Sequence, residues 1–303
     1  MGKRTLAFLA AIGATTIYGI NHTIAKGVMP DYVTPFGFIF LRVVGASILF
    51  WAISFLGPKE SIDKKDWPRL VLAALLGMVI NMLSFFKGLE LSTPINSSVL
   101  VTISPIIVVV LSAFFLKERI TLNKGLGIFL GFVGALALIL FGAELRQDAP
   151  NIPLGNTLFI VNATAYGAYL IVAKSLVAKY HPFTLMRWLF TIAMIINFPI
   201  TFGDFMLIEW ATMPLWVWGV VLFVIIGTTF CTYLFNIFAM TELKASTIGA
   251  FIYIQPVFGI LFALLTGKDS LTATKISATV LVLVGVYLAS KKVKPKAVHN
   301  LRS

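Results

Sequence analysis

The apolar residues of this chain occur in long runs that short polar segments separate. A helix needs about 20 predominantly apolar residues to cross the hydrocarbon core of a bilayer. On that scale the runs predict ten membrane-spanning helices, at about residues 6–26, 36–57, 68–90, 95–116, 123–142, 155–176, 183–204, 214–240, 246–266 and 274–291. The expected fold class is therefore an all-α integral membrane protein.

The same order of residues occurs twice along the chain. Residues 104–121 read SPIIVVVLSAFFLKERIT and residues 255–272 read QPVFGILFALLTGKDSLT, so that Pro105 and Pro256 are 151 residues apart. A second pair of segments repeats in the same order, with YGINHTIAK near the start of the chain and YGAYLIVAK near its middle. Matching segments in the same order indicate an internal duplication.

Each copy contains five predicted spans, an odd number, so the second copy begins on the opposite side of the membrane. Lys117 in the first copy then lies on one side and its equivalent Lys268 on the other. An inverted repeat of this kind is typical of secondary transporters, which alternate access around a site near the membrane midplane. We divide the chain into a first repeat, 1–146, and a second repeat with a basic tail, 147–303.

The basic residues predict which side faces the cytoplasm. Most of the 24 Lys and Arg residues fall on the side that holds both termini. Lys3, Lys59 and Lys124 belong to that side, whereas Lys26 and Lys275 belong to the other. Cytoplasmic loops retain positive charge, so we expect a multi-pass protein of the cytoplasmic (inner) membrane with both termini in the cytoplasm.

The composition narrows the classes of partner. Hydrophobic residues make up 59% of the chain and charged residues 12%, whereas a soluble domain is nearer one half and one quarter. The lipid bilayer is thus an expected partner. The net charge of +12 does not indicate nucleic acid, because these cations separate apolar runs and form no basic stripe on a water-exposed face.

The single cysteine, Cys231, can form no intrachain disulfide. We expect no metal or cofactor, and leave open a homodimer.

Several motifs recur in a fixed order: YGINHTIAK, Pro35, Arg42, GLELSTPINSSVLVTISPI, LKERIT and GLGIFLGFVG in the first half, then YGAYLIVAK, HPFTLMR, MTELKASTIGAFIYIQPVFG and GKDSLT in the second. Over about residues 6–290 this order resembles the drug/metabolite transporter superfamily, specifically chains with two EamA domains. The resemblance implies two inverted five-helix bundles around a central cavity. It also implies transport of small metabolites, amino acids or drugs, often outward. Tyr18 stands where a tryptophan is common in this family.

The first predicted span carries a polar stripe. Tyr18, His22 and Lys26 are spaced four residues apart and share one helix face, with Asn21 beside them. Polar groups within lipid are costly and are functional candidates by default, so this stripe can line a water-filled cavity. The alternative is that Asn21 and His22 join neighbouring helices while Lys26 extends to the outer interface or acts at a gate.

Arg42 lies about two turns inside the second predicted span. Its planar guanidinium can hold a substrate carboxylate. Alternatively, it pairs with helix-end carbonyls or with a carboxylate such as Asp31. Arg187 is its counterpart in the second half, nearer the cytoplasmic interface. Lys87 and Glu90, three residues apart near the outer end of the third span, are expected to form their own ion pair.

Other polar and aromatic positions complete the expected cavity lining or, in the alternative interpretation, form hydrogen bonds between helices. The cavity-lining set is Tyr18, Asn21, His22, Arg42, Asn81, Phe85, Ser98, Tyr166, Tyr169, Asn236, Tyr253 and Gln255. Pro105 and Pro256 are predicted to kink the fourth and ninth spans at matched depths, which makes those helices candidate gates. Gly127, Gly131 and Gly134 predict a close helix–helix approach.

These observations favour a transporter for a small molecule, either an exporter or a facilitator, with no catalytic residues. An intramembrane enzyme is disfavoured, because the three histidines, His22, His181 and His299, have no metal-ligand spacing. A channel is disfavoured because no segment resembles a selectivity filter. A receptor or scaffold without transport stays open. His22 is the one titrating group at useful depth for proton coupling, and a facilitator is slightly favoured.

Overall fold

The computed structural model describes residues 2–115, 117, 120–142, 146–243, 251 and 254–290. These residues form ten helical rods and no strand. Eight of the rods are long and apolar enough to cross a membrane. The exceptions among the described residues are α1, which is more polar, and α13, whose described part is short. The protein is therefore an all-helical, multi-pass membrane protein.

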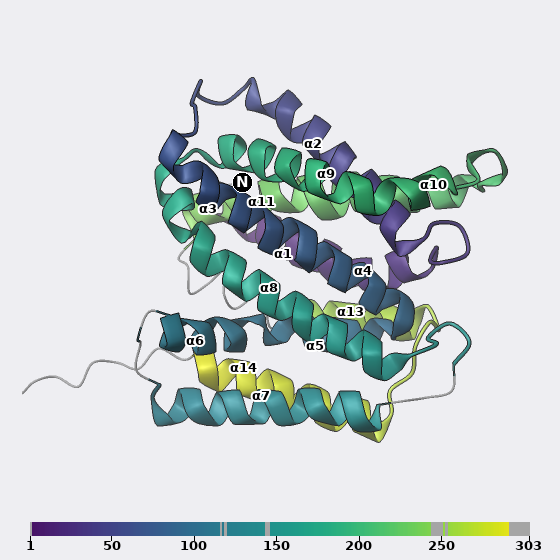
Figure 1. Ribbon diagram of the computed structural model, residues 1–303. Coiled ribbons are helices and arrows are strands. Elements are labelled where there is room, and N and C mark those ends of the chain that lie inside the picture. Colours follow the sequence, from purple (N-terminus) through teal and green to yellow (C-terminus); the bar gives the residue numbers. More distant parts are fainter. Residues whose placement is uncertain are drawn as a thin grey trace, which may run out of the picture.

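The first half consists of five rods (Figure 1). Two of them are interrupted, the third by a π-helix, η2, and the fourth by a short 3₁₀ segment, η3. In chain order the elements are α1 (Lys3–Lys26), α2 (Pro35–Ser54), η1 (Lys64–Asp66), α3 (Trp67–Ala74), η2 (Leu75–Ile80), α4 (Asn81–Leu91), α5 (Pro94–Leu100), η3 (Val101–Ile103), α6 (Ser104–Phe115) and α7 (Leu122–Phe141).

The second half repeats this order, and its third rod again contains a π-helix, η5. The elements are α8 (Ile152–Lys179), α9 (Pro182–Met206), η4 (Trp210–Thr212), α10 (Leu215–Leu222), η5 (Phe223–Cys231), α11 (Thr232–Glu242), α13 (Gln255–Leu265) and α14 (Ala273–Ser290). The predicted ninth span, 246–266, lies partly outside the described residues. The other predicted spans match rods to within several residues.

The helix starts follow from local sequence. Thr34 and Thr93 each precede a proline, and each threonine hydroxyl accepts a hydrogen bond from a backbone N–H in the first turn, of Gly37 and Asn96 respectively. A threonine side chain satisfies one of the free N–H groups of the first turn, and proline at the first helical position has none to satisfy. The sequence Thr-Pro therefore sets where α2 and α5 begin.

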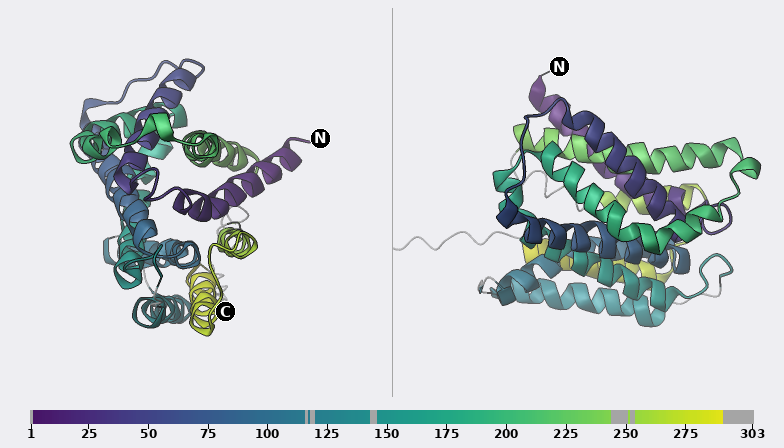
Figure 2. Two further views of the ribbon diagram at one scale, coloured as in Figure 1. Left: turned by 90° about the vertical axis from the view of Figure 1, so that its right-hand side faces the viewer. Right: turned by 45° about the horizontal axis from the view of Figure 1, so that its top comes forward.

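Helices of the first half pack against helices of the second half. The first rod of one half contacts the third and fourth rods of the other: α1 packs against α11 and α13, and α8 packs against α4 and α6. The second rods, α2 and α9, pack against each other, as do the fifth rods, α7 and α14. Figure 2 shows these rods side by side, most of them nearly end-on in its left view. Residues from both halves therefore surround the middle of the molecule.

The glycines predicted to allow close approach do so between α7 and α14. A Cβ atom added to Gly127 would lie 2.5 Å from the backbone N of Ala289, and one added to Gly285 would lie 2.6 Å from the backbone N of Gly131. Since real Cβ atoms do not approach other atoms so closely, only glycine permits these backbones to touch. The prediction from the glycine spacing is confirmed.

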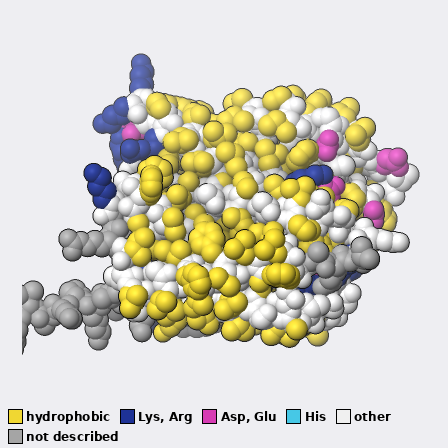
Figure 3. Space-filling model, turned by 60° about the horizontal axis from the view of Figure 1, so that its bottom comes forward, with side chains coloured by type: hydrophobic (Ala, Val, Ile, Leu, Met, Phe, Trp, Pro, Cys, Tyr) yellow, Lys and Arg dark blue, Asp and Glu magenta, His cyan; other side chains and the backbone are white. Residues whose placement is uncertain are grey.

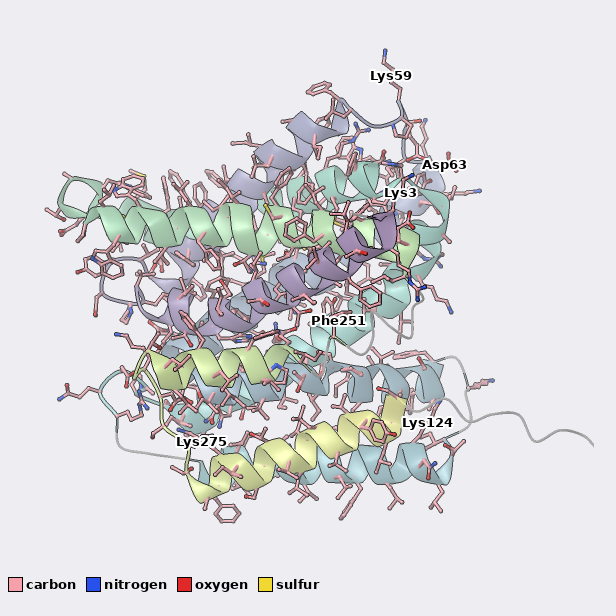
Figure 4. All side chains as sticks on the ribbon, turned by 180° about the vertical axis from the view of Figure 1, so that it is seen from behind. Lys3, Lys59, Asp63, Lys124, Phe251 and Lys275 are labelled. Carbon is pink, nitrogen blue, oxygen red and sulfur yellow. The ribbon has the colours of Figure 1, made fainter. Side chains whose placement is uncertain are left out.

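The surface is divided into an apolar band and charged ends. Figure 3 shows hydrophobic side chains over the middle of one face, with Lys and Arg concentrated at one end and most Asp and Glu at the other. In Figure 4, Lys3, Lys59 and Lys124 lie at the same end and Lys275 at the opposite end. This is the separation into sides that the loop charges predict.

Candidate functional site

Four tyrosines and one arginine face one another in the middle of the molecule. Tyr18 comes from α1, Tyr166 and Tyr169 from α8, and Tyr233 from α11, and their phenol groups are close enough to interact electrostatically. The guanidinium of Arg42, on α2, interacts with Tyr18 and Tyr233. We call these five residues the tyrosine–arginine cluster. Both halves of the chain contribute to it.

The guanidinium of Arg42 makes few polar contacts with the described residues. The side chain is 9% exposed, and its Nε donates to Thr229 Oγ1 over 2.7 Å. The guanidinium carbon lies 5.7 Å from the ring centre of Phe86. Within the described part of the chain, its two Nη atoms have no hydrogen bond and no carboxylate pairs with it. The pairing with Asp31 considered from sequence is absent there.

Exposure differs sharply along α8. Tyr166 is 40% exposed and Tyr169 is 7% exposed, although their ring centres are only 5.9 Å apart. Tyr166 also interacts electrostatically with Tyr18 of α1. The cluster therefore contains one exposed and one buried tyrosine of α8.

The remaining wall of the cluster is aromatic. Tyr233 packs against Phe50 and Phe190, each with ring centres 5.9 Å from its own. Its hydroxyl lies 3.9 Å from the sulfur of Met78, in the π-helix η2. Small-molecule sites are usually lined by apolar and aromatic side chains with a few convergent polar groups, and the cluster has this composition.

Three residues of the polar stripe on α1 join neighbouring helices. Asn21 Oδ1 accepts a hydrogen bond from Thr228 Oγ1 at 3.0 Å, and His22 Nδ1 is hydrogen-bonded to Ser97 Oγ at 2.6 Å. Lys26 Nζ donates to the carbonyl of Glu90 at 2.6 Å, where α4 ends. Asn21, His22 and Lys26 are all buried, and these bonds join α1 to η5, α5 and the end of α4.

The other candidate residues are dispersed. Asn81 and Asn162 exchange hydrogen bonds between side-chain amide and backbone carbonyl, at 3.2 and 2.8 Å, and so join α4 to α8. Ser98 is fully buried against α13, where a Cβ on Gly259 would lie 2.3 Å from its hydroxyl. The ring of Phe85 packs against His22, with centres 5.3 Å apart.

Asn236 and Gln255 are half-buried, and Tyr253 lies outside the described residues. Pro105 follows η3, where the fourth rod is interrupted, and Pro256 lies in the first turn of α13. Lys87 and Glu90 form the expected ion pair.

Sequence reasoning gave no sign of the π-helices. Both third rods contain one, and each borders the cluster, with Met78 in η2 and Thr229 in η5. A π-helix shifts the side chains that follow it around the helix, and such segments are frequent at functional sites. Thr229 lies within η5 and Tyr233 follows it by two residues, and apolar periodicity does not reveal the π-helix.

A second charged group lies at the end of the molecule that holds Lys275 (Figure 4). Asp269 accepts hydrogen bonds from Lys275 Nζ at 2.8 Å, Arg146 Nη1 at 3.1 Å and the backbone N of Ile95 at 3.0 Å. The side chains of Asp269 and Lys275 are both 0% exposed. We call Asp269, Lys275 and Arg146 the outer ion cluster. Its burial was not expected, since Asp269 and Lys275 belong to a predicted loop and a helix start.

The sequence profile of the EamA-like transporter family matches residues 5–140 and 153–291. This chain belongs to the EamA-like transporter family. The two matched segments coincide with the two halves of the structure, so each half is one EamA domain.

Relatives of this EamA protein share its length. It is 28% identical to an uncharacterized transporter from Archaeoglobus fulgidus, over 91% of this chain and 96% of the relative. It is 22% identical to the uncharacterized transporter YyaM from Bacillus subtilis, over 95% and 94%. A solved crystal structure superposes with a TM-score of 0.61 at 19% identity, covering 95% of this chain and 98% of the other. The protein is thus a membrane transporter of the EamA family.

Proposed function

We propose that this protein is a secondary transporter that moves small carboxylate-bearing metabolites, such as amino acids or amphipathic acids, across the cytoplasmic membrane. The observation that carries the proposal is the buried Arg42, whose Nη atoms have no partner in the described structure. An unpaired cation within a membrane protein is costly. A substrate carboxylate would satisfy it with two parallel hydrogen bonds.

We further propose that the two EamA domains form an inverted repeat of ten spans around a central cavity and work by alternating access. The contacts between the halves support this arrangement, because the packing of α1 on α11 and α13 has its equivalent in the packing of α8 on α4 and α6. The paired π-helices support it as well. With two equivalent halves, the same set of contacts can close either end of the molecule in turn.

The polar and apolar parts of the cluster suggest how a substrate would lie. Its carboxylate would bind Arg42, and its apolar body would pack against Tyr166 and Tyr233. Hydroxyl groups of the tyrosines can donate to the same carboxylate or to a second polar group. A neutral molecule of the same shape would leave Arg42 unpaired and should bind more weakly.

We propose facilitated diffusion over proton coupling. His22 is 2% exposed, bonded to Ser97 and packed on Phe85. These contacts suit a residue that joins α1 to α5 more than one that exchanges protons with water. We also propose that both termini lie in the cytoplasm, because Lys3 and Lys59 lie at one end of the molecule and cytoplasmic segments retain positive charge.

The test is uptake of labelled amino acids and other small carboxylates into proteoliposomes, each paired with its neutral amide. Wild-type protein should transport at least one carboxylate and discriminate against its amide, and Arg42→Gln should abolish that discrimination. Arg69→Gln is the matched control, because it makes the same substitution at an exposed arginine of α3. Equal transport of acid and amide by the wild type would contradict the substrate class. Uptake that depends on a pH gradient and is lost in His22→Ala would overturn facilitated diffusion.

A further inference from the structure

A pocket of about 380 Å³ lies where α2 ends, at the end of the molecule that carries Lys3 and Lys59. Its lining includes Ser54, Phe55, Lys59, Glu60 and Arg187. The pocket is separate from the tyrosine–arginine cluster, and the proposed transport cycle does not use it.

Arg187 supplies a cation without a carboxylate partner. Its Nη2 donates to the carbonyl of Glu60 at 2.9 Å, and Nη1 lies 3.4 Å from Ser54 Oγ. Its Nε is buried and has no acceptor among the described residues. The carboxylate of Glu60 is turned to the start of α9, where it accepts a hydrogen bond from the backbone N of His181 at 2.8 Å. The pocket therefore contains an arginine whose charge no described acidic side chain neutralises.

Three tryptophans beside the pocket indicate its position relative to the membrane. The guanidinium of Arg187 lies 5.0 Å from the ring centre of Trp51. Trp51 contacts Trp188 at 5.4 Å between ring centres, and Trp188 contacts Trp67 at 5.0 Å. Tryptophan is enriched where a membrane protein crosses the headgroup layer. The pocket thus lies at the level of lipid headgroups.

Apolar side chains beside the pocket point away from the protein. Phe55 and Leu56, in the turn after α2, are each 83% exposed. A free phosphate ion gives such side chains nothing to cover them, whereas the acyl chains of a lipid do. Lys59 follows three residues later and extends from the same loop (Figure 4).

We propose that this pocket binds the phosphate of an anionic phospholipid, with Arg187 and Lys59 as its cations and Phe55 and Leu56 against its acyl chains. Basic pockets between membrane helices on the cytoplasmic side suit such headgroups. A bound lipid joins the α2 turn to the start of α9, and so holds the ends of two helices that pack along their length.

The experiment is native mass spectrometry of the full-length protein in detergent, with phosphatidylglycerol or phosphatidylcholine added. Wild type should retain phosphatidylglycerol preferentially, and Arg187→Gln should reduce that retention about fivefold or more, the effect of one interfacial cation. Lys65→Gln is the matched control, because Lys65 is an exposed lysine of the same segment outside the pocket. This control should retain the lipid as the wild type does.

Lys59→Gln provides a second test that does not depend on the folding of an Arg187 variant, and it should lower retention about fivefold. Equal retention by wild type, Arg187→Gln and Lys59→Gln would overturn the proposal. So would displacement of the lipid by excess inorganic phosphate, which would assign the pocket to the free ion. Equal retention of the two lipids would also overturn it.

Discussion

Arg42 and Lys275 are both cations buried inside a membrane protein, yet their surroundings differ. Lys275 is fully buried and paired with Asp269, which also binds Arg146 and the first turn of α5. Arg42 has a single hydrogen bond, from Nε to Thr229, and no carboxylate partner within the described residues. The charge of Lys275 is balanced by a buried carboxylate, whereas no described carboxylate balances the charge of Arg42.

This difference predicts that mutations at Lys275 affect the stability of the protein, whereas mutations at Arg42 affect transport. Removing one member of a buried ion pair leaves the other member charged and unpaired, which is strongly destabilising. Removing a cation that has no counter-ion removes a cost and not a support. The outer ion cluster should therefore respond to mutation in folding, whereas the tyrosine–arginine cluster should respond in transport.

The largest expected effect is in the outer ion cluster. Lys275→Met should destabilise the protein by up to about 3 kcal/mol, the lower end of the range for a broken buried pair. Asp269 loses its closest buried cation but keeps its contact with Arg146. The measurement is the thermal midpoint of the purified protein in detergent, with Lys65→Met as the control for loss of an exposed lysine. An unchanged midpoint for Lys275→Met would show that the pair contributes little and would remove the contrast with Arg42.

The second effect is on transport. Arg42→Gln should lower uptake of a carboxylate substrate at least tenfold, since a hydrogen bond to a charged group contributes about 1.5–3 kcal/mol. Its thermal midpoint should change far less than that of Lys275→Met. Arg42→Gln should thus lose uptake and keep its thermal midpoint, whereas Lys275→Met should show the larger fall in thermal midpoint. A fall in midpoint equal to that of Lys275→Met would make Arg42 a structural residue.

A smaller effect is expected at the amide pair between α4 and α8. Asn81→Ala and Asn162→Ala should each destabilise the protein by about 0.6–1.7 kcal/mol, the range for hydrogen bonds between membrane helices. The double variant should cost about the sum of the single variants, because each amide donates to a backbone carbonyl that the other substitution leaves in place. Equilibrium unfolding of the four proteins measures this, and a double variant no less stable than either single variant would contradict two separate hydrogen bonds.

The smallest effect concerns pH. The Arg146 guanidinium, with two 2.9 Å hydrogen bonds, holds the pKa of Asp148 below its ordinary value. The folded pKa is depressed, so this contact stabilises the protein above the unfolded pKa of about 3.9 and is lost as pH falls through the folded value. Asp148→Asn should slightly lower the thermal midpoint at neutral pH. The difference between variant and wild type should shrink under strongly acidic conditions, and an equal difference at every pH would exclude this contact as its source.

Much of the fold follows from the sequence because membrane spans obey local rules. Each span must be apolar over a bilayer thickness, and Thr34-Pro35 or Thr93-Pro94 fixes a helix start through hydrogen bonds within one turn. The duplication and the loop charges can likewise be read directly from the sequence. Span positions, the repeat and the two charged sides could therefore be predicted, and so could the approach of Gly127 to a second helix.

The site was predicted less completely, because residue type does not say which helix a side chain meets. Asn21, His22 and Asn81 have the composition of a cavity lining, yet they bond to Thr228, Ser97 and Asn162. A polar group in a span needs a partner, and a neighbouring helix satisfies it as well as a substrate does.

The sequence by itself determined that this is a membrane protein of two related halves, because hydrophobicity and repetition can be read along a single chain. Only the tertiary structure decided which buried charges are satisfied. Arg42 meets tyrosines from α1 and α11 with no counter-ion among the described residues. Lys275 meets Asp269, whose other partners come from distant segments. Such distances depend on how helices pack, and on two π-helices that turn side chains away from the regular helical period.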